Sequence, residues 1–378
     1  MKPFPHLTDT NDPWLLTPGP LTTSLSVKQA MLRDWGSRDP DFIAMIARIR
    51  SHLVALAKGG EAYTAVPVQG SGTYAVEAML TTLVPRGAKL LILVNGAYGK
   101  RATQICDYAG RSYVVYETAE DTPPEPDAVA AILAADPGIS HVFAVHCETT
   151  TGILNPIREI AAVTAKAGRR LLVDSMSAFG ALPIDAETVP FDALAASSNK
   201  CLEGVPGLGF VIVRKTALKE AAGNAVSLSL DLAEQVKALD AGGQFRFTPP
   251  VQVLAAFDQA ISEHAAEGGV AGRGARYTAN RDRLIAGMRT LGFATLLPDE
   301  LQAPIIVTFR MPADPAFRFT EFYDRLKAMG YVIYPGKLTV AESFRMGCIG
   351  RLGAPEIDGA LAAVAEALKA MGVTNPAP

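Results

Sequence analysis

The chain has 378 residues, of which 49% are hydrophobic and 19% are charged, and its formal net charge is −3. This balance is typical of globular proteins with a large buried core, and it excludes disordered and collagen-like chains. A small negative net charge gives no long-range attraction to nucleic acid or to an anionic membrane surface, so we expect neither as a partner. A small-molecule substrate is the expectation that remains.

The spacing of the cysteines and the N-terminal sequence indicate the cellular compartment in which we expect the protein. The cysteines lie far apart and form no CxxC pair, which excludes a zinc ribbon and a disulfide framework. They are Cys106, Cys147, Cys201 and Cys348. The N-terminus has no apolar leader, and no stretch reaches the ~18 apolar residues that span a bilayer. We therefore expect a cytoplasmic protein with reduced thiols and no metal site.

Between about residues 60 and 215, short apolar runs alternate with amphipathic segments, the pattern of buried parallel strands and crossover helices. The predicted strands are Leu90–Val94, Tyr113–Tyr116, His141–His146, Arg170–Asp174, Ala193–Ser197 and Phe210–Val213. The predicted helices are Thr73–Leu83, Lys100–Tyr108, Pro126–Ala134 and Ile157–Ala167. The region is therefore predicted to be an α/β domain.

A long helix over Pro249–Glu267 ends in Gly-Gly, which predicts a domain hinge near residue 272. The segments beyond it predict a small α+β unit with helices Gly274–Thr290, Thr320–Met329 and Pro355–Met371 and strands Pro304–Phe309, Tyr331–Tyr334 and Ser343–Gly347. The first 50 or so residues show too little apolar periodicity for a separate domain, and we expect them to join the small unit or wrap a partner subunit. The predicted division is an arm over 1–20, a large domain over 21–271 and a small domain over 272–378.

The first motif with chemical content is Gly70-Ser71-Gly72-Thr73, directly before a helical run. Backbone N–H groups and two hydroxyls at a helix N-terminus suit a phosphate group, although ordinary helix capping explains the motif equally well. The motif lacks the Gly-Lys-Ser/Thr ending of a Walker A loop. It is not the dinucleotide fingerprint either, because no predicted strand leads into it.

Two further residues, together with the Gly70–Thr73 motif, indicate which ligand the site would hold. Asp174 ends an apolar strand, where parallel sheets bind ligands, and Lys200 lies in a loop of small residues just after another strand. A phosphate cradle, a strand-end acid and a lysine are what pyridoxal phosphate requires: a grip on its phosphate, an anion beside its ring nitrogen and an amine for a Schiff base. Tyr98 follows another strand at the same sheet edge, where its ring could stack on a flat ligand. The segment Glu148–Gly152 follows a further strand at that edge, where its threonine hydroxyls could reach a phenolate oxygen.

At this point the chain resembles a known family. The segments LLTPGPLTTS, VQGSGTYAVEA, LVNGAYGKR, HCETTTGILNPI, LLVDSMSAFGALPID, SSNKCLEGVPGLGFVI, GQFRFTPP and SFRMGCIG are similar to the 2-aminoethylphosphonate–pyruvate aminotransferases, within the class V, fold-type I pyridoxal-phosphate enzymes. The resemblance runs over nearly the whole chain. It implies a large domain with a mainly parallel seven-stranded sheet between helices, a small α+β C-terminal domain, and transfer of an amino group from 2-aminoethylphosphonate to pyruvate in phosphonate degradation.

The resemblance also implies roles for individual residues. Lys200 would form the Schiff base and Asp174 would pair with the ring nitrogen. Thr248 would reach the neighbouring subunit's cofactor phosphate, so the active unit would be a homodimer, and Arg345 would bind the substrate anion. The remaining implied contacts are Ser71, Gly72 and Thr73 at the phosphate or the mouth of the site, Tyr98 against the cofactor ring, and Thr150 at a cofactor oxygen.

Alternatives remain at this stage. Alanine–glyoxylate or serine–pyruvate aminotransferases share the cofactor residues, and a cysteine desulfurase would need a mobile cysteine, whereas Cys348 lies in a strand-like run. A non-catalytic relative would lack Lys200. Tyr98 could be a core residue, Arg345 an ion-pair partner at the surface and Thr150 a simple turn hydroxyl.

Overall fold

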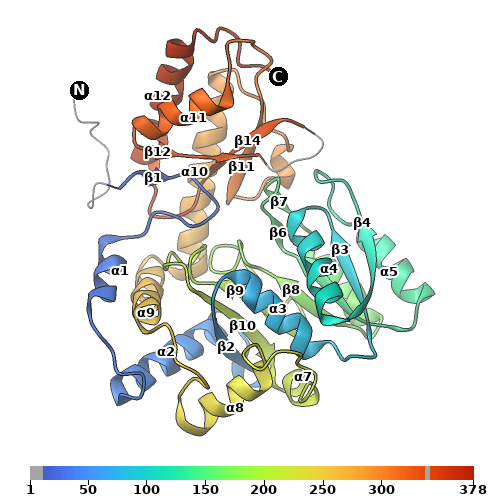
Figure 1. The fold of residues 1–378 in the computed structure, drawn as a ribbon. Helices are drawn as coiled ribbons and strands as arrows, with labels where there is room; N and C mark the ends of the chain where they lie inside the picture. Colours follow the sequence, from blue (N-terminus) through green and yellow to red (C-terminus); the bar gives the residue numbers. More distant parts are fainter. Residues whose placement is uncertain (1–11, 337–340) are drawn as a thin grey trace.

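The computed structural model describes residues 12–336 and 341–378. A large twisted sheet lies between two layers of helices, with a smaller unit beside it (Figure 1). The sheet order is β2-β10-β9-β8-β5-β3-β4. Its strands are β2 (Tyr63–Gln69), β3 (Lys89–Val94), β4 (Ser112–Glu117), β5 (Ile139–Val145), β8 (Arg170–Asp174), β9 (Ala193–Ser197) and β10 (Leu208–Arg214). The expected seven-stranded, mainly parallel sheet is confirmed.

One strand direction differs from the prediction. β10 was expected among the parallel strands, but it pairs antiparallel with both β9 and β2. The physical reason is the short connection from β9 to β10, which holds no helix that could cross the sheet. A chain that turns back without a crossover lays the next strand antiparallel to the last. That connection carries Lys200.

Strand β2 was missed in the sequence because Pro67 interrupts its apolar run. Proline has no backbone N–H to donate to a neighbouring strand, so it is unusual in a central strand, which has a neighbour on each side. In the structure β2 is an edge strand that pairs with β10 alone within its sheet, so the proline is tolerated. β2 leads directly into the Gly70–Thr73 motif, so the expectation that no strand precedes this motif is wrong.

Each strand feeds two cores, because successive side chains point to opposite faces of the sheet. In β3, Leu91 and Leu93 enter one core while Leu90 and Ile92 enter the other. The first core is covered by α2 (Pro40–Leu56), α5 (Pro126–Ala135), α6 (Ile157–Lys166) and α9 (Val251–Ala266). The second is covered by α3 (Gly72–Leu83), α4 (Ala97–Ala109), α7 (Lys215–Glu220) and α8 (Leu232–Gly242). The sheet is therefore buried on both faces.

Helix α2 lies in the N-terminal stretch for which the sequence indicated little periodicity. Its buried residues are Phe42, Met45, Ile46, Ile49 and Leu53, which recur in the i, i+3, i+4, i+7 pattern of one helix face. Short elements nearby are α1 (Leu25–Gln29), η1 (Ala30–Leu32) and η2 (Gly60–Ala62), and β6 (Cys147–Glu148) pairs with β7 (Ile153–Leu154) farther along the chain.

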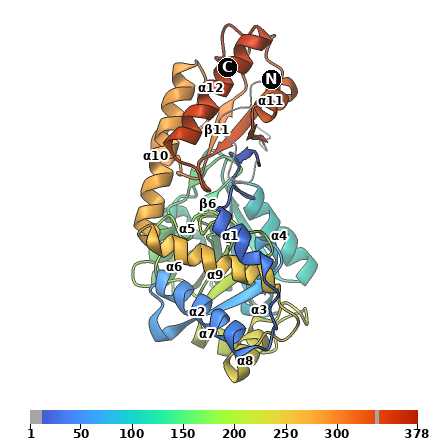
Figure 2. The same ribbon diagram turned by 90° about the vertical axis from the view of Figure 1, so that its left-hand side faces the viewer.

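The smaller unit is built on an antiparallel sheet with the order β11 (Ile306–Arg310), β14 (Ser343–Gly347), β13 (Tyr334–Pro335). Helices α10 (Gly269–Thr290), α11 (Phe319–Ala328) and α12 (Ala354–Met371) pack with it around a separate apolar core (Figure 2). β1 (Trp14–Leu15) pairs with β12 (Tyr331–Val332), so the N-terminal segment adds to this unit. η3 (Asp299–Leu301) precedes β11. The predicted small C-terminal α+β domain is confirmed, and the exact domain boundaries stay a prediction.

None of the helices in residues 12–336 and 341–378 is both long and apolar enough to cross a membrane.

Candidate functional site

A cavity of about 490 Å³ opens at the carboxyl ends of β8 and β9, the edge where α/β sheets bind ligands. It brings together six of the predicted site residues: Ser71, Gly72, Thr73, Tyr98, Asp174 and Lys200. Its other lining residues are Gly19, Pro20, Gly70, Tyr74, Val76, Arg101, Met176, Ser197, Asn199, Pro206 and Gly207. Thr150, Thr248 and Arg345 do not line it.

The predicted phosphate cradle lies at the start of α3. Ser71 is the N-cap residue, and its side chain makes no capping hydrogen bond, so its hydroxyl is not used in holding the helix. A Cβ atom at Gly72 would lie 2.2 Å from Met176 Sδ, so any other residue would displace Met176 in the cavity wall. The helix N-terminus carries about half a positive charge and faces this cavity, which suits an anion.

Asp174 is the last residue of β8 and is only 5% exposed. Its carboxylate accepts a hydrogen bond of 2.9 Å from Met176 N, and it has no ion pair within the described part of the chain. Burial raises the pKa of Asp174 to about 6, although the nearby charges of Arg101 and Lys200 act to lower it. A buried carboxylate without an ion pair is costly, so this site suits a ligand with a positive nitrogen.

Lys200 lies in the connection between β9 and β10 and reaches the N-terminal segment. Its Nζ donates to Pro18 O at 2.7 Å and to Gly19 O at 3.3 Å. A Cβ atom at Gly19, whose φ is +110°, would lie 2.7 Å from Nζ, so only glycine allows this backbone to approach the amine. These two backbone carbonyls help to hold the amine at the cavity wall.

Ser197 supplies a further sign of a polar ligand. Its side chain lines the cavity, is 3% exposed, and its hydroxyl has no hydrogen-bond partner among residues 12–336 and 341–378. Buried hydroxyls are normally paired, so one without a partner at a cavity wall is ready for a ligand atom. With Asp174, Lys200 and the α3 cradle, these residues fit pyridoxal phosphate.

Tyr98 and Thr150 are joined through the buried Glu148. Tyr98 N and Thr150 N both donate to the Glu148 carboxylate, at 3.1 Å and 3.0 Å. The Thr150 hydroxyl donates to Glu148 Oε1 at 2.6 Å and accepts from Ala97 N at 2.9 Å. Because a hydroxyl has one hydrogen, Thr150 has none left to donate to a cofactor oxygen in this arrangement. Glu148, whose pKa burial raises, therefore holds two loops of the site together.

Arg345 lies in β14 and is 1% exposed. Its guanidinium donates from Nη1 to Thr149 O at 2.7 Å and from Nε to Pro335 O at 3.1 Å. Burial lowers the pKa of Arg345, while Tyr98, Tyr334 and Glu148 are near enough to oppose that effect. It therefore lies beside the cavity without lining it, and its contact with a substrate anion stays a prediction.

Thr248 is exposed and lies outside the cavity, just before α9. Its reach into a neighbouring subunit is likewise still a prediction.

Sequence reasoning did not single out Arg101, Met176, Ser197 or Asn199, which also line the cavity. A signal existed for Arg101, because it follows Tyr98 by three positions on α4 and so shares one helix face with it.

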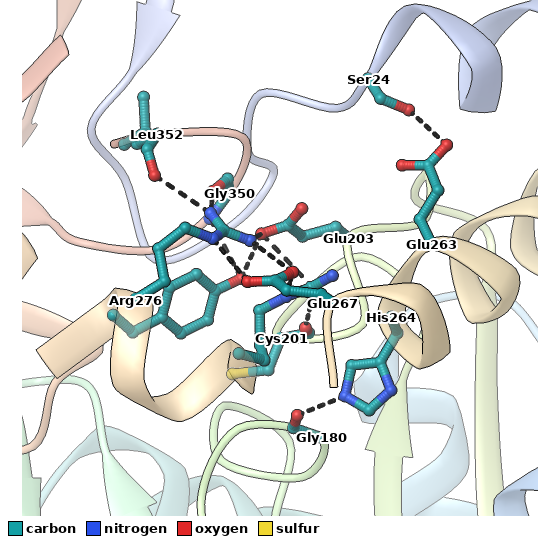
Figure 3. A network of polar contacts seen from close by, with 12 residues as sticks. Ser24, Gly180, Cys201, Glu203, Glu263, His264, Glu267, Arg276, Gly350 and Leu352 are labelled. Carbon is teal, nitrogen blue, oxygen red and sulfur yellow. Dashed lines mark hydrogen bonds and ion pairs between the residues drawn. The ribbon is translucent and has the colours of Figure 1, made fainter. Parts of the chain in front are cut away.

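The connection between β9 and β10, which carries Lys200, is called the lysine loop below. Beside it lies a cluster of buried charges, defined by Glu203, Glu267, Arg273, Arg276 and Tyr277 (Figure 3). Arg276 bonds Glu203 at 2.8 Å and Glu267 at 2.7 Å. Burial alone would raise the pKa of Glu267, but the two arginines lower it to about 2. The cluster fixes the segment three residues beyond Lys200.

Arg276 also reaches the smaller unit. Its Nη1 donates to Gly350 O at 2.6 Å and to Leu352 O at 3.0 Å, as Figure 3 shows. The lysine loop, α10 and the chain after β14 therefore meet at one guanidinium.

Comparison with known proteins gives consistent matches. The family model for class-V aminotransferases matches residues 25–318. The chain is 54% identical over 365 residues to a 2-aminoethylphosphonate–pyruvate transaminase from Pseudomonas entomophila, covering 97% of this chain and 99% of that protein. It is also 54% identical to one from Rhizobium meliloti, over 97% of this chain and 96% of that protein.

Among solved structures, pyridoxamine–pyruvate aminotransferase from Mesorhizobium loti is similar with a TM-score of 0.87 and 25% identity, covering 97% of this chain and 94% of that one. Alanine–glyoxylate aminotransferase from Nostoc gives a TM-score of 0.87 at 24% identity, covering 94% of this chain and 95% of that one. The Nostoc likeness shows the shared fold alone.

Proposed function

Because this chain belongs to the class-V aminotransferases, and within them to the 2-aminoethylphosphonate–pyruvate transaminase family, we propose that it transfers the amino group of 2-aminoethylphosphonate to pyruvate. The products are phosphonoacetaldehyde and L-alanine, and the cofactor is pyridoxal phosphate. The observation that carries the proposal is the single cavity in which Lys200, Asp174 and the α3 N-terminus meet.

The alternative assignments, alanine–glyoxylate and serine–pyruvate aminotransferase, are less well supported. The Nostoc alanine–glyoxylate enzyme shares 24% of its residues with this chain, against 54% for the phosphonate transaminases.

When bound, pyridoxal phosphate supplies a carbon that accepts an amino group and a ring that withdraws electrons from the neighbouring carbon of the substrate. Lys200 is the one lysine among the described residues that line the cavity, so its Nζ is the amine that attaches the cofactor. The same Nζ, when not attached to the cofactor, would be the base that takes the proton from the substrate carbon beside the amino group and gives that proton up again as the transfer is completed.

Asp174 supports this chemistry through its charge. Because Asp174 is buried, its carboxylate would hold a proton on the ring nitrogen of a bound cofactor more strongly than it could in water. The fold already buries the Asp174 carboxylate, so the protein does not have to rearrange around this side chain when a positively charged ligand binds.

Arg345 is the proposed anion-binding residue for both substrates. A guanidinium fork can bind a phosphonate or a carboxylate through two parallel hydrogen bonds. Its position beside Tyr98 and Glu148 places this charge next to the cavity.

The proposed active unit is a homodimer. Exposed apolar side chains gather near Thr248: Phe247 is 47% exposed, Tyr74 51% and Leu228 73%. Phe247 and Tyr74 also line a second cavity of about 150 Å³ next to the cofactor cavity, with Tyr74 common to both. A second copy that covered this face would bury these side chains and bring its Thr248 towards the phosphate end of the site.

A donor screen tests the proposed reaction. The holoenzyme is incubated with pyruvate and either 2-aminoethylphosphonate or serine, and alanine formation is followed. We expect kcat/KM for the phosphonate to exceed that for serine by ~100-fold or more, as a site built for one polar group discriminates against another. Equal or greater use of serine would overturn the assignment.

The proposed homodimer is tested by sedimentation of the protein near micromolar concentration. A cytoplasmic location is part of the proposal, and cell fractionation tests it.

A further inference from the structure

We propose that Arg101 is a cofactor-binding residue, whose guanidinium neutralises the cofactor phosphate at the N-terminus of α3. The inference rests on the proposed function, since it concerns the same cofactor. It adds a binding residue from α4 to the cradle formed by Ser71, Gly72 and Thr73.

Position is the first argument. Arg101 lines the cavity together with the cradle residues, and its Nη1 donates to Thr73 Oγ1 at 3.3 Å. Thr73 belongs to the first turn of α3, where the backbone N–H groups have no partner within the helix. The guanidinium therefore lies at the same rim as the N–H groups that would receive the phosphate.

Charge is the second argument. Arg101 has no ion pair in the described part of the chain, whereas its neighbour Lys100 pairs with Glu117 at 3.2 Å. A phosphate carries nearly two negative charges near neutral pH, and a helix N-terminus offers only about half a positive charge. Lys200 is committed to the other end of the cofactor. Arg101 is thus the cation at the cavity wall that remains available for the phosphate.

Orientation is the third argument. The Arg101 guanidinium carbon lies 4.9 Å from the centre of the Tyr98 ring, within the range of a cation–π interaction. With the Thr73 bond, this contact holds the side chain from two sides without an ion pair among the residues that the structure describes. A cation fixed in this way loses little freedom when an anion binds.

The experiment compares two ligands that differ by the phosphate alone. Apoprotein is titrated with pyridoxal phosphate and with pyridoxal, and binding is followed by absorbance. We expect Arg101→Gln to weaken binding of pyridoxal phosphate by at least ~10-fold, the usual order for a lost charge-assisted hydrogen bond, and to leave pyridoxal binding within about twofold. Arg101→Lys should recover part of the loss.

Lys100→Gln is the matched control, because it removes the same charge one position away, where the side chain is half exposed and already paired. It should change neither affinity. Inorganic phosphate should compete with pyridoxal phosphate at lower concentration in the wild type than in Arg101→Gln. A thermal melt of each apoprotein confirms that the variants fold.

The outcomes separate the hypotheses. An equal loss for both ligands would mean that Arg101 serves only to support the Tyr98 ring, and it would overturn the inference, as would unchanged affinity for pyridoxal phosphate. If the wild-type apoprotein bound no pyridoxal phosphate at all, the proposed function itself would fail.

Discussion

Replacing Asp174 by asparagine should remove a pH-dependent loss of stability and should also lower activity. The carboxylate is 5% exposed, and burial raises its pKa to about 6 from an ordinary value near 4. The folded apoprotein therefore binds a proton more tightly at this site than the unfolded chain does. The associated stability is present below about pH 4 and is lost as pH rises through 6.

The magnitude follows from the shift. About two pKa units at 1.36 kcal/mol each give on the order of 2–3 kcal/mol between about pH 4 and pH 8. Asparagine can accept the same bond from Met176 N, but its buried NH₂ group costs a further amount that does not depend on pH. The informative quantity is thus the pH dependence of the free energy of unfolding rather than its absolute value.

The assay is urea unfolding of the two apoproteins at both pH values, with transamination measured on the holoenzymes. The variant should lack the wild-type loss of stability at high pH. Its turnover should fall by at least ~100-fold, or roughly 2.7 kcal/mol of barrier, because the anion at the ring nitrogen is gone. A parallel pH dependence in both proteins, or a variant within threefold of wild-type turnover, would refute the reasoning.

Four further outcomes are expected. Lys200→Ala should lose nearly all transamination, and borohydride reduction of the wild type should label Lys200; a label on another lysine contradicts its assignment. Arg345→Ala should cost about 2–5 kcal/mol in kcat/KM for 2-aminoethylphosphonate and for pyruvate together, with partial recovery in Arg345→Lys; an effect on neither substrate moves the anion site elsewhere. Thr248→Ala should weaken cofactor binding by about 1–2 kcal/mol, and a monomer with full cofactor affinity would argue against a shared site. Glu203→Gln should lower the free energy of unfolding by about 2–4 kcal/mol, because the buried Arg273 and the half-buried Arg276 lose a partner, whereas Asp358→Asn at an exposed pair should have a much smaller effect; equal effects would remove the role given to burial.

The central sheet was predictable because its strands are continuous apolar runs with punctuation between them. Arg170–Asp174 and Ala193–Ser197 match the predicted bounds, so the polar residues that follow these strands could be placed at one sheet edge from the sequence. What depends on pairing could not be predicted in this way. The direction of β10 and the presence of β2 follow from which strand finally lies beside which, and Pro67 hides the latter.

The candidate site also contains residues that the sequence predicts and residues that it does not. Asp174 and Lys200 are recognisable because their position in the chain fixes their place at the sheet edge. The roles of Arg101, Ser197 and Glu148 arise from which side chains lack or gain partners once distant segments pack. That information is three-dimensional, and a single sequence does not contain it in readable form.

The cluster of buried charges around Arg276 has a consequence for how the chain matures on the ribosome. Large proteins usually fold their N-terminal domain first as it emerges. Here Glu203 and Glu267 are synthesised before the arginines of α10 that neutralise them, and the carbonyl groups of Gly350 and Leu352 emerge later still. The contacts that fix the segment after Lys200 can therefore be completed only after the chain has been made as far as Leu352, although the strands of the sheet are all synthesised before residue 215.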